Sequence, residues 1–365
     1  MAERGRGAIL CACMLFCAVA PACKGDKTVA PPASAAAGAN SAAQAGLDAG
    51  ASTGPAAPAQ PDAGAPDETA ADAPARPSIT TVAEVLFLGA GEAKLAGPCP
   101  VSVPAEARLR CLFDERYRGD AKAASLAYEL WTRHAIVAGV APKHTMNGGY
   151  RGMIALEPAV PTGADRKHLE WMVTNMKDFE SFFDAFAKAR ADAGAPPRVK
   201  FRFRPLVLRF MRSPRGRTPS AYASDWSVSY NLAGSLWRSV DAARETMFHE
   251  IFHDNDDDWS PPALGEIYRG ILAKCGTRVP CLTPYTPSEI QVRGGTYYSF
   301  QPGNGDSVRE YAADLATRFF RENRDTLAGA PPKKPFKCGP PENARAWGLM
   351  RDAYFGGQDL VPACP

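Results

Sequence analysis

The sequence predicts an α+β domain with a small sheet, because helical and strand periodicities both occur in its globular part. Residues 166–191 carry apolar side chains at intervals of three and four, which is the period of one buried helix face. Residues 198–204 alternate Val199, Phe201 and Phe203 with cations, which is the period of a half-buried strand. Residues 226–230 form a second short strand candidate, followed by a turn at residues 231–234.

The first 23 residues have the composition of a secretion signal, in which two arginines precede an apolar run. The run ends at Cys23, with small Ala20 and Ala22 at the positions that signal peptidases require. A membrane-spanning helix needs about 20 apolar residues, and this run is shorter and contains Pro21. A cysteine at the processing point resembles a bacterial lipoprotein signal, which implies lipidation of Cys23. Ordinary cleavage would instead leave a soluble secreted protein.

Residues 24–78 consist mostly of Ala, Pro, Gly, Ser and Asp. Such a segment buries too little apolar surface to offset its chain entropy, so we expect a disordered tether. About fifty flexible residues would hold a catalytic domain, expected at residues 79–365, some tens of ångströms from a membrane. The expected location is the cell envelope, facing the periplasm or the exterior.

Ten cysteines are present, and four of them lie in the first 23 residues. The remaining six form an even set, which fits disulfides in an oxidising compartment. No pair has the C-x-x-C spacing of a redox or zinc motif. Their short separations favour three pairs: Cys99 with Cys111, Cys275 with Cys281, and Cys338 with Cys364.

The charge balance identifies no partner. The chain has 42 basic and 39 acidic residues, a net charge of +3, so no global field favours nucleic acid. We therefore expect no nucleic-acid partner, and the sequence does not determine the oligomeric state. His134, His144 and His168 are isolated in the sequence, and we expect structural roles for them, although His144 could line a cleft.

A helix capped by Ser239 carries the motif H-E-x-x-H at His249, Glu250 and His253. Residues four apart share a helix face, so both histidines can bind one metal, most naturally zinc. Zinc lowers the pKa of bound water, and Glu250 is then placed to accept the water's proton. The preceding strand, residues 226–230, can offer its edge to an extended peptide beside the metal.

A catalytic zinc site needs a third protein ligand and one open position. Glu310 is the main candidate, because Glu310, Asp314 and Arg318 share one face of a predicted helix. Two local alternatives compete: a capping box that starts at Ser307 and recruits Glu310, and an ion pair between Asp314 and Arg318. The other carboxylates considered as ligands are Asp254, residues 256–258, Glu266 and Glu289. A solvated acidic loop, or a calcium site, is an alternative for residues 254–258.

HEIFH at residues 249–253 followed by EYAAD at residues 310–314 resembles the glutamate-zincin metallopeptidases, especially the anthrax lethal factor type catalytic domain. The resemblance is local to these two motifs. It implies a zincin-like fold, one zinc ion (Zn2+) per chain with Glu310 as third ligand, and Asp314 as support for a histidine. In that family a tyrosine that precedes the ligand helix stabilises the oxyanion. By this resemblance the tyrosine corresponds to Tyr298 or Tyr297 here.

These observations together predict a zinc-dependent endopeptidase tethered to the cell envelope, which acts on a peptide or protein substrate. The rival hypothesis is a noncatalytic zinc-binding lipoprotein of the envelope that serves as an interaction module. A structural zinc site closes its fourth position with protein, and no obvious closing residue is present. The sequence also lacks a G-x-S-x-G elbow and a G-x-x-x-x-G-K-[ST] loop, so serine hydrolase and nucleotide-driven functions have no anchor.

Overall fold

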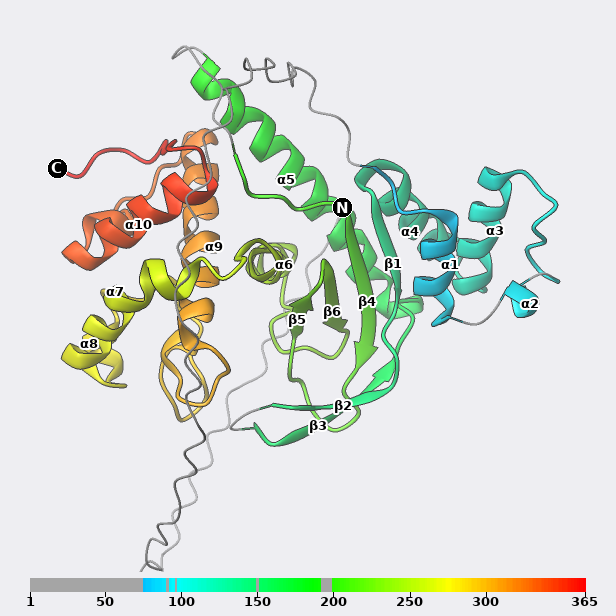
Figure 1. Ribbon diagram of the computed structural model, residues 1–365, viewed down its shortest axis with the longest axis horizontal. Coiled ribbons are helices and arrows are strands. Elements are labelled where there is room, and N and C mark those ends of the chain that lie inside the picture. Colours follow the sequence, from blue (N-terminus) through cyan, green and yellow to red (C-terminus); the bar gives the residue numbers. More distant parts are fainter. Residues whose placement is uncertain (1–74, 90–91, 96, 149–150, 192–198) are drawn as a thin grey trace, which may run out of the picture. The chain divides into compact units, whose positions relative to one another are not determined.

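The computed structural model describes residues 75–89, 92–95, 97–148, 151–191 and 199–365, which all lie in one compact unit, residues 68–365. The signal, Cys23 and nearly all of the tether lie outside the described residues. The architecture is α+β, as the sequence predicts (Figure 1). The helices, the longer 3₁₀ turns (η) and the strands are, in chain order, α1 (Ile79–Phe87), α2 (Glu92–Leu95), α3 (Ala105–Arg116), α4 (Ala121–His134), β1 (Ile136–Val140), β2 (His144–Asn147), β3 (Met153–Pro158), η2 (Gly163–Arg166), α5 (Lys167–Ala191), β4 (Leu206–Arg212), β5 (Ala221–Ser224), β6 (Ser227–Asn231), α6 (Val240–Asn255), α7 (Ser260–Cys275), α8 (Val279–Leu282), η3 (Tyr298–Phe300), α9 (Ser307–Leu327), η4 (Phe336–Cys338) and α10 (Pro341–Tyr354).

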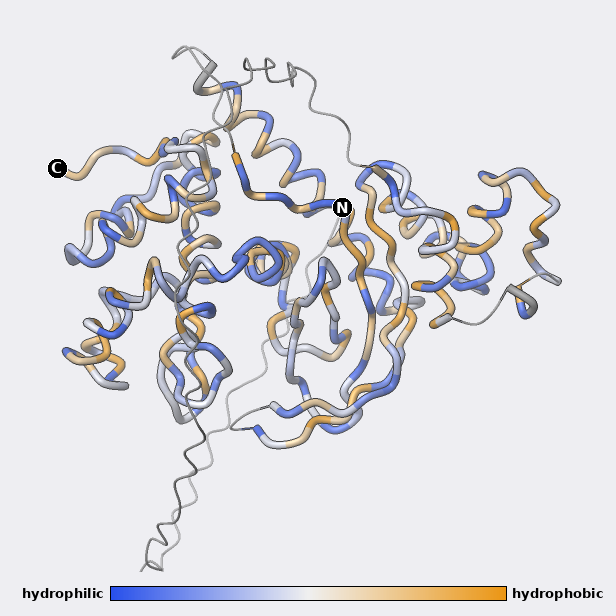
Figure 2. The backbone as a smooth tube through the Cα atoms, in the orientation of Figure 1, coloured by the Kyte–Doolittle hydropathy of each residue, from blue (hydrophilic) through white to orange (hydrophobic). Residues whose placement is uncertain are grey.

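The sheet is mixed, with β4 at its centre. Strand β4 pairs in parallel with β1 on one side and with β6 on the other, and β3 joins it antiparallel at its end. The path of the sheet is β2-β3-β4-β6-β5, so β5 forms an edge. Strand β1 is buried on both faces and is coloured as hydrophobic along most of its length in Figure 2. Helix α1 packs so closely on β1 that a Cβ at Gly139 would lie 2.3 Å from the carbonyl oxygen of Val85.

Helix α5 confirms the helical prediction for residues 166–191. Its apolar face is buried, and it packs on α6 and on the sheet, where His168 contacts the ring of Tyr230. Edge-to-face contacts join Phe179 to Phe248 of α6 and to Phe320 of α9. Such ring pairs add about 0.5–1.5 kcal/mol beyond the burial of their area. This aromatic core fixes α6 and α9 relative to each other.

The strand predicted at residues 198–204 is wrong, since none of residues 199–204 belongs to a strand. Phe201 and Phe203 are buried as the alternation requires, but the backbone pairs with helix ends instead of a strand. The amides of Lys200 and Phe201 donate to the carbonyl of Tyr354 at the end of α10. The amide of Arg202 donates to Asn255 Oδ1 at the end of α6. The alternation of apolar and charged residues therefore indicates an extended segment with one buried side, and such a segment need not pair with a neighbouring strand.

The described residues contain three disulfides, and they are the pairs that the short sequence separations favour. They join Cys99 to Cys111, Cys275 to Cys281, and Cys338 to Cys364. No helix within the described residues has the length and apolarity needed to cross a membrane.

Candidate metal centre

Helix α6 presents the H-E-x-x-H motif from inside the core. Ser239 caps the helix as expected, because its hydroxyl accepts from the amide of Ala242 at 3.1 Å. The apolar residues around the motif are fully buried, namely Ala243, Met247, Phe248, Ile251 and Phe252. His249 and His253 lie together on one face, with their Nε2 atoms 3.2 Å apart. Residues four apart share a helix face, which allows these two nitrogens to lie side by side.

Glu310 reaches the same point from the first turn of α9. The alternative capping box at Ser307 is absent, because the N-cap is Asp306, which accepts from the amides of Val308 and Arg309. Glu310 is therefore not folded back onto its own helix end. Its Oε2 lies 3.1 Å from His249 Nε2 and 3.8 Å from His253 Nε2.

The three atoms form a donor set that suits zinc. Ligands that each lie about 2.0–2.2 Å from a tetrahedral ion are about 3.3–3.6 Å from one another, close to the distances seen here. His249 Nδ1 lies 3.1 Å from Asp314 Oδ1 and donates to it, so in the neutral ring Nε2 carries the lone pair. A lone pair, a second imidazole and a carboxylate then converge, and a cation is the natural partner. His249, His253 and Glu310 are the one such cluster found within the described residues.

Asp314 contacts His249 through the ring nitrogen that faces away from Glu310. Its carboxylate is 5% exposed, and one oxygen accepts from the ring of His249. The alternative ion pair with Arg318 is not formed, because the guanidinium of Arg318 pairs with Glu322 instead. A carboxylate behind a metal-binding histidine fixes the ring's orientation and tautomer.

The charges of the centre match this arrangement. Burial lowers the pKa of His249, but hydrogen bonds with Asp314 and Glu310 outweigh it and raise this pKa well above its usual value. For Glu310 burial acts in the opposite direction and raises the pKa, but hydrogen bonds with both histidines outweigh burial and lower this pKa to about 2. The carboxylate of Glu310 is thus ionised at neutral pH, and a proton on His249 provides the positive charge when no metal is bound.

Glu250 lies beside the cluster without belonging to it. Its residue is 8% exposed, and burial raises the pKa of its carboxyl, although the neighbouring histidines oppose that shift. A carboxylate whose pKa is raised by burial is better suited to accept and return a proton. This matches the proton-transfer role that the motif predicts.

Tyr298, rather than Tyr297, faces the centre. The ring of Tyr298 lies 6.2 Å from that of His249, measured between centroids. Burial raises the pKa of its hydroxyl, and the carboxylates of Glu310 and Glu250 raise it further, so the hydroxyl remains a donor. Tyr297 points elsewhere, since its hydroxyl lies 3.0 Å from that of Thr283.

The free strand edge beside α6 belongs to β5, whereas the sequence suggested residues 226–230. That segment corresponds to β6, which is enclosed between β4 and β5. The amide of Asn231 donates to the carbonyl of Ser220. In an antiparallel pair, successive residues of a strand point their backbone groups alternately toward and away from the partner strand. The N–H and C=O groups of Ala221 and Ala223 therefore point away from β6. The sequence contained no alternation that marks this edge.

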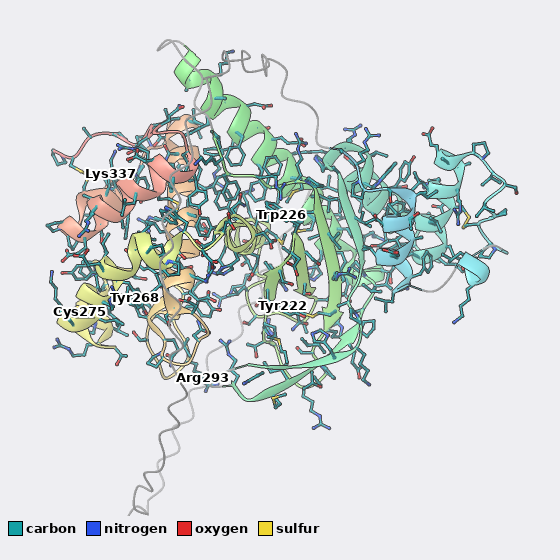
Figure 3. The ribbon with its side chains drawn as sticks, viewed as in Figure 1. Tyr222, Trp226, Tyr268, Cys275, Arg293 and Lys337 are labelled. Carbon is teal, nitrogen blue, oxygen red and sulfur yellow. A yellow bond between two sulfur atoms is a disulfide. The ribbon has the colours of Figure 1, made fainter. Side chains whose placement is uncertain are left out.

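The turn between β5 and β6, which contains Trp226 (labelled in Figure 3), is attached to α6 immediately after the motif. Asp225 and Trp226 both have positive φ, which matches the twist of a two-residue hairpin. Asp254 Oδ1 accepts from the amide of Trp226 at 3.0 Å, and the guanidinium of Arg202 lies 3.4 Å from the centroid of the Trp226 ring. Asp254 thus contacts the hairpin and does not belong to the candidate metal cluster found within the described residues.

The acidic loop after α6 is only partly solvated, which corrects the interpretation of residues 254–258 as a solvated acidic loop. Asp256 is fully buried, where it accepts from the amide and hydroxyl of Ser260. Arg309 of α9 bridges Asp256 and Asp258, a contact that no sequence pattern indicated. Glu266 pairs with Arg345, and neither Glu266 nor Glu289 joins the cluster.

His134, His144 and His168 do not belong to the cluster, and each has a polar partner of its own. His134 contacts Glu180, and His168 contacts the hydroxyl of Tyr230. His144 of β2 lies 2.7 Å from the hydroxyl of Tyr222 of β5.

Comparison with known proteins adds no relative. No protein-family model matches the chain, and no curated protein or solved structure is significantly similar to it.

Proposed function

We propose that this chain is a zinc-dependent endopeptidase of the glutamate-zincin type, with a zincin-like catalytic domain tethered to the cell envelope. The observation that carries the proposal is the convergence of His249 Nε2, His253 Nε2 and Glu310 Oε2, with Glu250 next to them. Glu310 is 57 positions from His253 and 61 from His249 in the sequence, so the two motifs alone only suggested this arrangement.

The proposed division of labour follows from the contacts. His249, His253 and Glu310 hold one zinc ion, and Asp314 fixes the ring of His249 through Nδ1. When bound, zinc acidifies a water molecule and polarises the carbonyl of the scissile bond. Glu250 accepts the proton of the attacking water and passes it to the nitrogen of the leaving amine. The hydroxyl of Tyr298 donates to the oxygen that becomes negative in the transition state.

The substrate class is a peptide in extended conformation. Strand β5 contacts α6 and turns the backbone groups of Ala221 and Ala223 outward. An extended peptide can pair with these groups beside α6, the helix that carries Glu250. A folded small molecule would use none of them.

Catalysis is favoured over a noncatalytic zinc module because the cluster holds three ligand residues and no fourth within the described part of the chain. A structural zinc site has four protein ligands.

The variant Glu250→Gln tests the choice between a peptidase and a noncatalytic zinc module, because it removes the proton acceptor and leaves the ligands intact. We expect about one zinc per chain and no cleavage of a peptide library that the wild type cleaves. A wild type that binds zinc and cleaves nothing across that library would favour the module.

We further propose that Cys23 is lipidated and anchors the chain. Cys23→Ser should move the protein from the membrane fraction to the soluble fraction, measured by fractionation and by the mass of the N-terminal peptide. Unchanged membrane retention would contradict the anchor and leave the proposed peptidase unaffected.

A further inference from the structure

Arg309 connects the two helices that carry the metal-binding residues. Its Nη1 lies 3.0 Å from Asp256 Oδ2, its Nη2 donates to Asp258, and its Nε lies 3.3 Å from Asp306 Oδ2. Asp256 and Asp258 follow the end of α6, while Asp306 caps α9. One guanidinium therefore joins the end of the helix with His253 to the start of the helix with Glu310.

The partner of Arg309 is firmly placed. Asp256 is fully buried, and its carboxylate accepts from the amide of Ser260 at 2.8 Å and from the hydroxyl of Ser260 at 2.6 Å. Its carbonyl accepts from the hydroxyl of Tyr354 at 3.2 Å. Arg309 is the one cation within the described residues that contacts this buried carboxylate. Asp256 thus provides a fixed point, tied to α7 and α10, against which α9 is set.

Glu310 depends on such a fixed point because of its place in the chain. It lies in the first turn of α9, and the ends of helices fray. The chain enters this turn through a loop in which Gly303 and Gly305 have φ of +73° and +63°. Glycine in these positions leaves the loop little intrinsic stiffness. The N-cap Asp306 holds the turn together internally, but it does not set the distance to α6.

We propose that Arg309 is a positioning residue, which holds the first turn of α9 so that Glu310 meets His249 and His253 at metal-binding distance. The inference rests on the proposed metal site and adds a residue that neither motif includes. Arg309 does not touch the metal position and acts through Glu310.

The sign of the effect separates positioning from simple electrostatics. A cation one residue from Glu310 repels a divalent metal, so loss of the charge alone would strengthen metal binding. Loss of positioning weakens it, because Glu310 then samples other distances. Partners of ligands typically change metal affinity by about 10- to 100-fold when they are mutated.

The test compares Arg309→Met with Arg321→Met. Arg321 also lies on α9 and joins it to α6, through Glu245 at 3.3 Å. The side chains of Arg309 and Arg321 are 32% and 29% exposed, so the two substitutions are made at similarly exposed positions. Arg321→Met removes one ion pair between α9 and α6, whereas Arg309→Met removes the contacts with Asp256, Asp258 and Asp306. Zinc dissociation constants are measured by competition with a chromophoric chelator, and the visible spectrum of the cobalt-substituted protein reports the ligand set.

We expect the zinc dissociation constant to rise about tenfold or more in Arg309→Met and to stay unchanged in Arg321→Met. The cobalt bands should weaken in Arg309→Met, because solvent oxygen replaces Glu310. Arg309→Lys should show a smaller rise, since an ammonium keeps the charge but not the fork that spans the carboxylates. If Arg309→Met does not fold, Arg309→Lys is the deciding variant.

An Arg309→Met protein with wild-type or tighter zinc affinity and an unchanged cobalt spectrum would overturn the inference. An unchanged dissociation constant in Arg309→Lys, where Arg309→Met fails to fold, would do the same. A wild-type protein that binds neither metal would overturn both this inference and the proposed site. A wild type that binds zinc but cleaves no peptide would overturn the peptidase proposal alone.

Discussion

Glu310→Gln is the change that most directly tests the third ligand. Glutamine has the size of glutamate but lacks its charge, and its amide is a poor zinc ligand. At neutral pH the Glu310 carboxylate is ionised, since its pKa is lowered to about 2 despite its burial. The substitution therefore removes a full negative charge placed 3.1 Å from His249 Nε2.

The expected magnitude follows from the position of Glu310 among the ligand atoms. Mutation of groups that only support a ligand weakens metal binding about 10- to 100-fold. Loss of a direct ligand should exceed that range, so we expect the zinc dissociation constant to rise by at least about 100-fold, or about 2.7 kcal/mol. Competition with a chelator measures the constant, and circular dichroism of the metal-free protein checks the fold.

Glu266→Gln is the matched control. The sequence offered Glu266 as another possible ligand, but the structure pairs it with Arg345, and its side chain is 75% exposed. An exposed ion pair contributes little, so zinc affinity and stability should both stay unchanged. A zinc dissociation constant of Glu310→Gln within about twofold of the wild type would refute the assignment of Glu310.

Four further predictions follow from the same geometry. Tyr298→Phe should lower kcat about 100-fold or more in a peptide-cleavage assay and leave zinc affinity unchanged, and a wild-type kcat would remove Tyr298 from the mechanism. Ala223→Pro deletes an outward amide on β5, so kcat/KM should fall by about tenfold with normal zinc content, and an unchanged value would exclude pairing of the substrate at this edge. Zinc binding should weaken about tenfold for each pH unit below the raised pKa of His249, because the metal displaces its proton, and calorimetry in buffers of different ionisation enthalpy should show that release. Burial lowers the pKa of His168 to about 4, so as the pH falls below about 6.5 the unfolded chain binds a proton that the folded chain does not, and stability is lost. Between pH 7 and pH 5 the free energy of unfolding should therefore drop about 1–2 kcal/mol more in the wild type than in His168→Asn. An equal drop in the two proteins would contradict this prediction.

The elements that could be predicted from the sequence are those with a local cause. The apolar face of α5 and the cap of α6 at Ser239 follow from residues within one helix. The disulfide pairs follow from short separations, which leave each cysteine a near neighbour. Their physical basis is the geometry of a few consecutive residues, which the remainder of the chain does not alter.

The errors arose where a partner elsewhere in the chain decides the outcome. Residues 199–204 have the burial pattern of a strand, yet their amides bond to Tyr354 and Asn255. The edge at β5 could not be recognised, since its short sequence has no alternation and its exposure depends on how β6 pairs.

The sequence by itself determined that His249 and His253 share one helix face with Glu250 next to them, because the α-helical repeat brings residues four apart together. Tertiary structure alone decided that Glu310 completes the cluster and that Arg309 ties α9 to Asp256. It also decided that the carboxylate of Asp314 contacts His249 and not Arg318. These contacts join residues more than fifty positions apart. Their distances are set by the packing of α6 and α9 on one aromatic core, and no local rule specifies that packing.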